Sequence, residues 1–456
     1  MERVLIKELV KKIGQKVRVC GFIVSKRDHG KIMFWDVKDK SGVAQVVVKK
    51  EEKKGEISTD SVVEVVGEVI KRPKGQQNPK LKTGIIELTA KKIIVLSESQ
   101  TLPFPVDTAG YEINEEKRLT FRYLDLRRER LQNNLLKRHQ VNQFIRQYLS
   151  QNGFVEVETP ILTKSTPEGA RDYLVPSRQQ TGKFYALPQS PQQYKQLLMV
   201  AGLEKYFQIA RVFRDEDQRA DRQPEFTQLD IELSFATQEE ILQLVEKMLV
   251  LLAADLKGYK ITKKPFPRLK YAEVIKKYQT DKPDLRQNKK DPKELAFAWI
   301  LDWPYFTRDP KTKKLDPNHH IFTAPKEEDI SLLDKNPLKV RSWQHDLILN
   351  GFELGGGSIR IINPTVQKKI FALVGLSEKE IKEKFGHILE AFSYGAPPHG
   401  GIALGMDRLL AIFCGEENIR EVMAFPKTGD GRDLTMKAPS EVDKEQLKDL
   451  KLVVKK

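Results

Sequence analysis

The sequence predicts an α+β protein with more than one domain, in which a small β-barrel precedes a larger body of strands and helices. Three observations support this fold class. Short β-branched runs fill the first 100 residues. Residues 101–105 contain two prolines, which favour an extended tether. A helical periodicity then begins at residue 119, and 456 residues are enough for two or three domains.

The N-terminal β-runs are rich in Val and Ile and partly alternate with polar residues. They cover residues 17–24, 32–37, 43–48, 61–67 and 85–88. Five short strands in so short and basic a segment predict a barrel of the oligonucleotide-binding (OB) kind. The alternative is a basic barrel that only packs against the neighbouring domain.

We expect the barrel to occupy residues 1–100 and a linker to occupy 101–118, so that the larger domain covers 119–456. Apolar residues recur at helical spacing over 119–151 and predict a long helix there, which the Asn-Gly pair at 152–153 ends as a C-cap signal. A short strand follows, and strands and helices then alternate to the end of the domain.

Composition excludes several classes of protein. Hydrophobic residues make up 39% of the chain and charged residues 31%, which is typical of packed cores under a water-facing surface. The chain lacks the long apolar run of a membrane span and an apolar leader, so we expect no membrane partner and a cytoplasmic location. Cys20 and Cys414 are the only cysteines, which excludes a disulfide framework and a cysteine zinc site and fits a reducing compartment.

Positive charge is concentrated in the predicted barrel. The chain has a net charge of +16, and residues 1–100 contribute +9 of it, with 22 Lys and Arg against 13 Asp and Glu. A polyanion such as a nucleic acid is the partner that this distribution favours, and a merely solvated basic surface is the alternative.

Two adjacent strands of the larger domain carry polar residues where core would be expected. Residues 207–213 form a buried strand that runs into a charged turn, and residues 222–232 return as a second strand. Alternation places one aromatic, one amide and two carboxylate side chains on a single face of the return strand: Phe226, Gln228, Asp230 and Glu232. Because such a face makes a poor core, we expect it to meet a polar ligand.

Four further motifs carry polar and charged residues that could form a site. Residues 400–410 form a glycine-rich strand that turns into a helix with Arg408 in its first turn, which suits a phosphate. The others are residues 350–360, 190–195 and 166–171. Any one of them is more often a capped turn than a site, but their joint occurrence favours a site.

These motifs together resemble those of the class II aminoacyl-tRNA synthetases. Residues 213–216 with 222–226 resemble motif 2 of that family, and residues 400–408 resemble motif 3. The stretch that ends at Thr159 and Pro160 resembles motif 1, which builds the dimer interface in that family. More narrowly, the chain is similar nearly end to end to bacterial-type aspartyl-tRNA synthetases, most clearly at residues 121–127, 166–173, 350–360, 395–401 and 424–427.

The resemblance implies both a fold and a reaction. The barrel would bind the tRNA anticodon, and the larger domain would be a catalytic domain built on an antiparallel β-sheet flanked by helices. L-Aspartate and ATP would give aspartyl-adenylate and pyrophosphate, and the 3′-terminal adenosine of tRNA-Asp would then accept the aspartyl group. A cytoplasmic homodimer is expected.

The resemblance also assigns ATP-binding roles to particular residues. Arg214 and Arg408 would be the catalytic residues, with Arg214 between the α-phosphate and the substrate carboxylate and Arg408 on the distal phosphates. Phe226 would stack on adenine, and Asp346 and Glu353 would bind Mg²⁺, which prefers oxygen ligands. The expected ATP site comprises Arg214, Asp215, Glu216, Gln223, Phe226, Glu353, Gly405, Met406, Asp407 and Arg408.

The expected aspartate site combines cations for the β-carboxylate with acceptors for the ammonium group. Arg360 and Lys195 would pair with the β-carboxylate and so reject the neutral amide of asparagine. The ammonium group would be received by Glu168, Gln192 and Asp230. Ser190, Gln193, Tyr194, Arg214, His319 and His320 complete the expected set. The two histidines fall where the family has a substrate-gating pair, and a solvated loop or a metal site are the alternatives.

Five barrel residues are expected at the anticodon. Phe34 would stack on a base, Gln45 and Glu87 would bind base edges, and Arg27 would contact the backbone or a base. Because Met33 and Trp35 are also apolar, the alternative is that Phe34 belongs to the barrel core. His29 is compatible with relaxed enzymes, which also load aspartate onto tRNA-Asn.

One departure from the family concerns length. Bacterial relatives carry an extra domain of about one hundred residues between motifs 2 and 3, where this chain has only a short linker at 287–295. All the expected ligands lie outside that domain, so catalysis should survive its loss.

Three rival functions follow from the same residues. A protein that only binds nucleic acid would not need intact ATP residues, and a paralogue that adenylates aspartate without tRNA would not need the barrel. Within the enzyme class, asparagine specificity is disfavoured by Arg360, Lys195 and Asp230.

Overall fold

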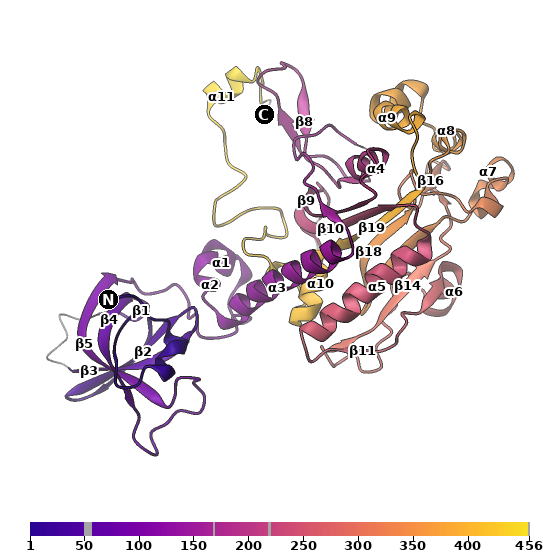
Figure 1. The fold of residues 1–456 in the computed structure, drawn as a ribbon. Helices are drawn as coiled ribbons and strands as arrows, with labels where there is room; N and C mark the ends of the chain where they lie inside the picture. Colours follow the sequence, from indigo (N-terminus) through magenta and orange to yellow (C-terminus); the bar gives the residue numbers. More distant parts are fainter. Residues whose placement is uncertain (50–56, 167–168, 218–219, 455–456) are drawn as a thin grey trace. The chain divides into compact units, whose positions relative to one another are not determined.

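The chain, seen in a computed structural model, folds into two compact units (Figure 1). The structure describes residues 1–49, 57–166, 169–217 and 220–454. One unit is Met1–Pro105 and the other is Val106–Lys456, so the division falls inside the predicted linker.

The first unit is a closed barrel whose described strands follow the order β1-β2-β3-β5-β4. The strands are β1 (Lys16–His29), β2 (Ile32–Asp39), β3 (Gly42–Lys49), β4 (Val62–Lys71) and β5 (Ile86–Ser97). The predicted OB-type barrel is therefore confirmed. Strand β1 is longer than its β-branched run because its first half pairs with β4 and its second half with β2.

Alternation separates the inside of the barrel from the outside. In β2, Met33, Trp35 and Val37 are buried in the barrel core, while Phe34 lies on the outer face and stays partly exposed. A short 3₁₀ helix, η1 (Ile6–Lys11), adds Ile6 and Leu9 to the same core. The placement of Phe34 in the core is thus excluded.

The second unit begins with three helices where one was predicted. Residues 119–151 fall into the end of α1 (Glu115–Thr120), then α2 (Arg122–Asp125) and α3 (Glu129–Gln151). The single-helix prediction is wrong because Arg128 takes an extended conformation just before α3, where its guanidinium turns inward to the buried carboxylate of Asp125. The predicted end is right, since Gly153 has the positive φ of a helix C-cap.

An eight-stranded sheet, counted over the described residues, forms the centre of this unit in the order β12-β14-β17-β18-β19-β10-β9-β6. Its strands are β6 (Val155–Glu156), β9 (Lys205–Phe213), β10 (Glu225–Ser234), β12 (Arg268–Lys270), β14 (Phe297–Leu301), β17 (Gln344–Leu349), β18 (Phe352–Ile359) and β19 (His399–Gly405). The inner pairs are antiparallel as predicted, but both edge strands, β12 and β6, pair in parallel. The sheet is therefore mixed.

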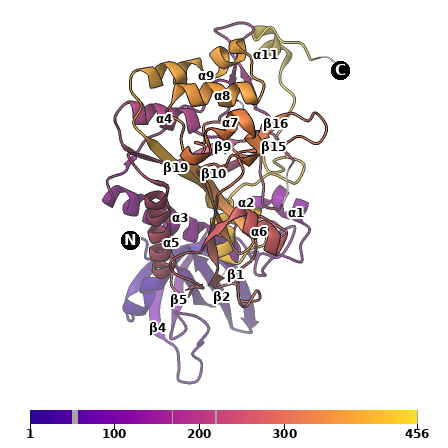
Figure 2. The same cartoon turned by 90° about the vertical axis from the view of Figure 1, so that its right-hand side faces the viewer.

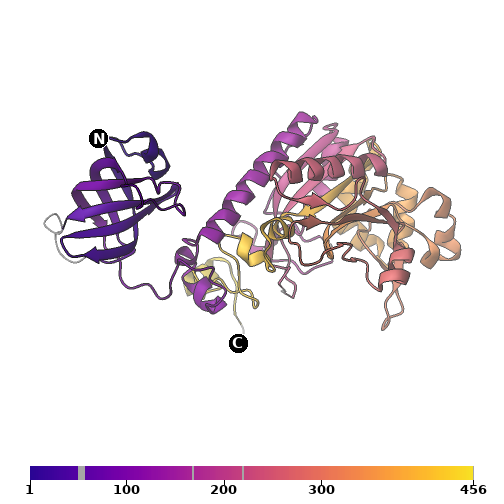
Figure 3. The same ribbon diagram turned by 90° about the horizontal axis from the view of Figure 1, so that it is seen from below.

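One face of the sheet is closed by α3, α5 (Gln238–Asp255) and α10 (Met406–Cys414). Helices α3 and α5 run side by side over it (Figures 1 and 3). Leu229 and Ile231 of β10 point into this core, so the alternate residues of β10 face the other side of the sheet, which carries the site.

The remaining elements lie around the sheet, and one of them, η5, packs against α3 and α10. Helices α4, α8 and α9 gather at one end of the unit (Figure 2). The elements are β7 (Leu174–Pro176), β8 (Phe184–Ala186), α4 (Gln192–Val200), β11 (Lys260–Ile261), α6 (Tyr271–Tyr278), β13 (Glu294–Leu295), β15 (Phe306–Arg308), β16 (Leu315–Pro317), η3 (Glu327–Asp329), α7 (Leu332–Lys335), η4 (Pro337–Lys339), α8 (Pro364–Leu373), α9 (Glu378–Ser393), η5 (Ile419–Val422) and α11 (Lys444–Asp449).

No helix in the described ranges is both long and apolar enough to cross a membrane.

Candidate active site and nucleic-acid interface

A cavity of about 690 Å³ opens on the uncovered face of the sheet in the second unit. Its walls come from β10, β17, β18 and β19, from α4, and from the loops after β9 and β16. It brings together sixteen of the residues singled out from the sequence: Ser190, Gln192, Lys195, Arg214, Glu216, Gln223, Phe226, Asp230, His319, His320, Asp346, Glu353, Arg360, Gly405, Asp407 and Arg408.

The face of β10 supplies the cavity floor, as alternation predicted. Phe226, Gln228 and Asp230 line the cavity, and Glu232 lies next along the same face. Arg214 follows β9 and is held by a backbone bond from its N–H to the Pro224 carbonyl, 2.8 Å. Its guanidinium carbon lies 5.2 Å from the centre of the Phe226 ring. A planar cation and an aromatic face thus stand side by side at one end of the cavity.

Arg408 reaches the cavity from the first turn of α10. One of its nitrogens donates to the Glu353 carbonyl at 2.6 Å, and another lies 3.2 Å from Asp221. Asp221 is exposed enough to exchange this partner for water, so the guanidinium stands ready for another anion.

Two carboxylates, Asp346 on β17 and Glu353 on β18, share the cavity wall. Desolvation in the cavity and the Asp346 charge raise the pKa of Glu353, whose side chain reaches solvent at the rim. No group of three or more metal-ligating side chains occurs in the described ranges. These two oxygens and the phosphates of a bound nucleotide are a donor set that suits Mg²⁺.

Neighbours hold Asp346 in place. The Gln344 amide donates to it at 2.7 Å, and His319 Nε2 lies 3.3 Å from its other oxygen. A Cβ on Gly356 would stand 2.6 Å from Asp346, so only glycine leaves room for this carboxylate. Desolvation alone would lower the pKa of His319, but the Asp346 charge outweighs it and the pKa is raised.

A buried group of four charges forms the other end of the cavity. Lys195 Nζ lies 3.0 Å from Asp230 and 3.2 Å from Glu232, and Arg360 binds Glu232 through two nitrogens at 2.9 and 3.2 Å. Burial would raise the pKa of Glu232, but Arg360 and Lys195 outweigh it and lower the pKa to about 2. Burial raises the pKa of Asp230 despite Lys195. Glu232 is therefore an ionised counter-charge for Arg360 and Lys195.

Four buried polar atoms beside these charges have no hydrogen-bond partner within the described part of the chain. They are Asp230 Oδ2, Gln192 Nε2, Gln228 Oε1 and His320 Nε2, all on residues that line the cavity. Because unpaired buried polar atoms are costly, a polar ligand with both donors and acceptors is the expected complement.

The His320 ring stacks on the Phe322 ring, with 5.0 Å between the ring centres. Desolvation of His320, with the nearby charges of Arg360 and Lys195, lowers its pKa to about 3. His320 is therefore neutral in the physiological range, and it is not part of a three-ligand metal site in the described chain.

The structure places four predicted site residues outside the cavity wall. Met406 is the first residue of α10, and its side chain is buried in the hydrophobic core that α3, α5 and α10 form against the sheet. Asp215 pairs with Arg171, Tyr194 bonds to Thr163 at 2.9 Å, and Gln193 is buried on α4 beside the cavity residue Gln192. The predicted contacts of these four residues with a ligand stay predictions. Glu168 lies outside the described residues.

Sequence reasoning missed Gln344, Asp221 and the supporting role of Glu232. Alternation along β17 could have found Gln344, since it stands two residues before Asp346 on the same face. Alternation did place Glu232 on the face of Asp230, but it could not show that Glu232 pairs with Lys195 and Arg360. Asp221 carries no such signal, because a loop brings it to Arg408.

The barrel carries the five residues expected at the anticodon on one outer face. Arg27 binds Asp36 at 2.7 Å and Gln45 at 3.3 Å, and Gln45 donates to Glu87 at 2.9 Å. The His29 ring stands edge-on to Phe34, at 5.2 Å between centres. This surface of β1, β2, β3 and β5 combines a partly exposed aromatic with hydrogen-bonding side chains, which is the pattern of single-stranded base recognition.

Comparison with known proteins gives the same picture. Residues 114–429 match the sequence profile of tRNA synthetases class II (D, K and N), and residues 17–96 match that of the OB-fold nucleic acid binding domain. An aspartate–tRNA(Asp/Asn) ligase of Rubrobacter xylanophilus is 42% identical over 96% of this chain and 94% of its own. An aspartate–tRNA ligase of Bacillus licheniformis is 39% identical over 98% and 97%.

Solved structures share the fold. Aspartyl-tRNA synthetase of Entamoeba histolytica has a TM-score of 0.73 at 21% identity, covering 93% of this chain and 91% of its own. Asparaginyl-tRNA synthetase of Pyrococcus horikoshii has a TM-score of 0.73 at 22% identity, covering 94% and 98%.

The alignment with the Rubrobacter protein also bears on length. It runs over 568 positions, so more than 100 of them have no counterpart among the 456 residues of this chain. The predicted shortening is therefore confirmed.

Proposed function

Since the chain belongs to the class II tRNA synthetases of the D, K and N group, we propose that it is an aspartate–tRNA ligase. It activates L-aspartate with ATP and transfers the aspartyl group to the 3′ end of tRNA-Asp. The observation that carries this proposal is the pair of buried cations, Lys195 and Arg360, beside the partnerless oxygen of Asp230.

Activation needs little acid–base chemistry, because the attacking α-carboxylate is already ionised. The work of the site is therefore to align the carboxylate with the α-phosphate and to neutralise charge. Arg214 spans the two groups, Phe226 stacks on adenine, and Arg408 binds the distal phosphates. Glu216, Gln223, Gly405 and Asp407 complete the nucleotide walls.

Asp346 and Glu353 would hold Mg²⁺, which would offset the negative charge of the nucleotide phosphates when bound. Two neighbouring carboxylates, one of which has a raised pKa, favour a divalent cation between them.

Selection of aspartate follows from complementary charge. Its ammonium group donates to the partnerless Oδ2 of Asp230 and to the side-chain oxygen of Gln192, and both residues line the same pocket. Its β-carboxylate meets Lys195 and Arg360. Asparagine would place an N–H₂ group against two cations, which leaves those cations under-compensated. His319 and His320 close over the bound amino acid from the loop after β16.

The direct test is aspartate-dependent exchange of pyrophosphate into ATP with purified protein. Exchange is expected with aspartate and not with asparagine. Arg214→Ala and Arg408→Ala should each abolish it, and exchange that persists in either variant would contradict the assignment of that arginine. Arg360→Gln should lower kcat/KM for aspartate at least 100-fold, because a buried ion pair loses one partner.

Transfer to tRNA uses the barrel. Phe34 stacks on an anticodon base, Gln45 and Glu87 read base edges, and Arg27 contacts the backbone or a base. Aminoacylation of tRNA-Asp is the expected result, and activation without transfer to any tRNA would overturn the ligase proposal.

We also propose that the enzyme charges tRNA-Asn. His29 packs against the base-stacking Phe34, and the Rubrobacter relative is named for both tRNAs. Charging assays with the two purified tRNAs decide this, and a failure to aspartylate tRNA-Asn would refute it.

A homodimer is proposed from the motif 1 segment. Strand β6 is an edge of the sheet, and Val155, Ile161 and Leu162 near it are about half exposed although apolar. Such side chains at a sheet edge favour a subunit interface. Sedimentation should give a dimer, and a stable monomer at assay concentration would exclude it.

A cytoplasmic location is proposed from the substrates, which are a tRNA and ATP, and from Cys20 and Cys414, both of which are free thiols.

A further inference from the structure

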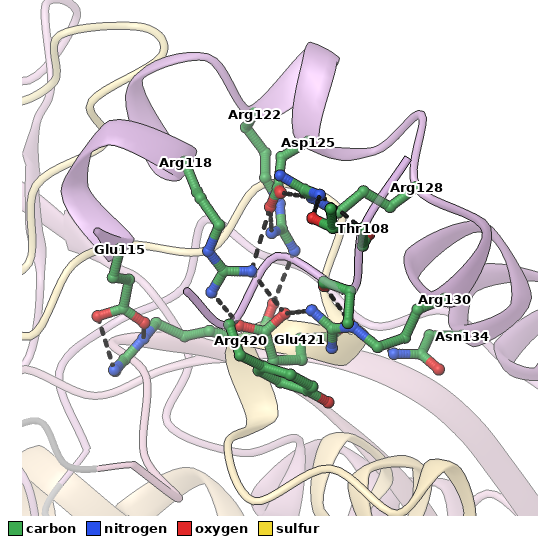
Figure 4. A network of polar contacts seen from close by, with 12 residues as sticks. Thr108, Glu115, Arg118, Arg122, Asp125, Arg128, Arg130, Asn134, Arg420 and Glu421 are labelled. Carbon is green, nitrogen blue, oxygen red and sulfur yellow. Dashed lines mark hydrogen bonds and ion pairs between the residues drawn. The ribbon is translucent and has the colours of Figure 1, made fainter. Parts of the chain in front are cut away.

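Five consecutive backbone carbonyls, from Arg420 to Ala424, accept hydrogen bonds from side chains of α2 and α3. Figure 4 shows Arg122 among the charged side chains around it, including Asp125 and Glu421. Arg122 alone binds three of them: Arg420 O at 2.9 Å, Met423 O at 2.8 Å and Ala424 O at 3.0 Å. Asn134 binds Glu421 O at 3.1 Å, and Arg138 binds Val422 O at 3.0 Å. Side chains thus satisfy the backbone carbonyls of this segment, as the N–H groups of a neighbouring strand would in a sheet.

The donors are themselves fixed by buried carboxylates. Arg122 and Arg128 both bind Asp125, at 2.7 and 2.6 Å, and all three side chains are shielded from solvent. Glu421 points back at the helices and binds Arg118 at 2.6 Å and Arg130 at 2.8 Å. Arg122 therefore has one available orientation, because its fourth bond is made to the fixed Asp125.

Both ends of the 419–427 segment contact the ATP-side wall of the cavity. At the first end, Ile419 lines the cavity and its N–H donates to the Ala220 carbonyl at 3.1 Å. At the other end, Lys427 and Gln223 bind each other twice: the Lys427 N–H donates to Gln223 Oε1 at 2.7 Å, and Gln223 Nε2 donates to the Lys427 carbonyl at 3.1 Å.

The second end also reaches the adenine side. Lys427 Nζ lies 3.1 Å from Glu225, the residue before Phe226. Ala220, Gln223 and Glu225 all belong to the turn and strand that carry the expected nucleotide contacts. The 419–427 segment therefore links the buried arginines to the nucleotide wall, and it has no comparable contact with Lys195 or Asp230 among the described residues.

We propose that Arg122 is a positioning residue for ATP, which acts through the carbonyls of Arg420, Met423 and Ala424 to hold Gln223 and Phe226 in place. The inference rests on the proposed function, since ATP is the substrate whose binding Arg122 supports. Arg122 touches no substrate itself.

The test is Arg122→Lys in the full chain, because a lysine keeps the charge but cannot span three carbonyls and Asp125. In aspartate-dependent exchange, KM for ATP should rise at least fivefold, while KM for aspartate stays within twofold and kcat per titrated active site changes less than KM for ATP. Arg146→Lys is the matched control on α3, since Arg146 is exposed and pairs only with Glu156 in the described structure. It should leave both KM values unchanged.

A second variant keeps the inference testable if Arg122→Lys does not fold. Asn134→Ala removes one carbonyl donor and should raise KM for ATP by a smaller factor. An unchanged KM for ATP in the folded variants, with only a lower number of active sites, would overturn the inference and leave a purely structural role.

Calorimetric titration with Mg-ATP, without aspartate, separates this inference from the proposed function. Weaker ATP binding by Arg122→Lys supports the positioning role even if wild-type protein shows no aspartate-dependent exchange, which would refute the ligase proposal alone. Equal ATP affinity of wild type and variant would refute the positioning role alone.

Discussion

At the residue scale, alternation along one strand, β10, predicted the floor of the cavity, and the family resemblance supplied most of its other residues. Phe226 and Asp230 were found because their neighbours Leu229 and Ile231 had to face the core. The method fails where a side chain reaches the site from a loop, as Asp221 does, or where the first residue of a helix turns inward, as Met406 does. Periodicity carries no information about either case, because neither a loop nor the first residue of a helix has a side-chain direction that a regular repeat fixes.

Phe226 supplies the first residue-scale prediction. Phe226→Leu should raise KM for ATP about tenfold and leave KM for aspartate nearly unchanged, because one aromatic stack on a base contributes about 1–3 kcal/mol. Steady-state exchange kinetics measure both constants. Phe226→Tyr keeps the ring and should behave like wild type; an equal rise in the two variants would show that the ring does not stack on adenine.

At the element scale, the sequence identified where strands and caps occur but not where a helix is interrupted. The break between α2 and α3 arises from the inward turn of Arg128 to Asp125, which are separated by three residues and would look like an ordinary surface pair on a continuous helix. Arg122, which also binds Asp125, contacts the carbonyl of Met423, 301 positions away in the chain, so local pattern could not reveal the burial of this group.

The Glu421 carboxylate makes the stability of this region depend on pH. Burial would raise its pKa, but Arg118 and Arg130 outweigh that effect and lower the pKa from 4.5 to about 2. Because the folded pKa is depressed, the contribution to the free energy of unfolding is present above pH 4.5 and is lost as the pH falls toward 2. Its size is on the order of 3 kcal/mol.

Glu421→Gln should therefore lower the melting temperature at pH 7, and the difference from wild type should shrink as the pH falls below 4.5. Thermal unfolding across that pH series is the measurement. The exposed neighbour Glu417→Gln is the control and should be nearly neutral throughout. A difference that is the same at pH 7 and pH 3 would contradict the assigned cause.

The short linker at 287–295 closes on itself. Both oxygens of Glu294 accept backbone N–H groups, from Gln287 and Asn288, at 2.8 Å each. Six Gly and Ser residues inserted between the exposed Lys289 and Lys290 leave that clamp intact. We expect aspartate-dependent exchange to be unchanged and stability to fall by less than about 1 kcal/mol. The same insertion with Glu294→Ala should be clearly less stable; if both proteins unfold alike, Glu294 does not close the linker.

At the scale of the whole molecule, the order of barrel, tether and catalytic unit was predictable, because composition changes at the prolines. The parallel pairing of the two sheet edges was not, since pairing partners lie far apart in sequence and strands as short as β6 and β12 carry little signal.

Because the barrel and the second unit are separate compact units, a substitution on the barrel should weaken tRNA binding without changing activation of aspartate. Phe34→Ala should raise KM for tRNA about tenfold or more through loss of base stacking, with no change in ATP–pyrophosphate exchange. Arg18→Ala is a control on the same barrel, because Arg18 pairs with Glu64 across β1 and β4, away from Phe34. A fall in exchange caused by Phe34→Ala would show that the barrel also affects activation.

The contact between Arg122 and the carbonyl of Met423 joins residues 301 positions apart. At about 5–20 residues per second, the ribosome makes the acceptor roughly 15–60 seconds after the arginine. During that interval the arginines of α1 to α3 lack their final partners, and the ATP-side wall of the cavity lacks the 419–427 segment that contacts it. A nascent chain arrested near residue 415 should thus gain no protection from protease when Mg-ATP is added, whereas the released protein should. Co-translational folding of this enzyme would be completed only by the last stretch to emerge.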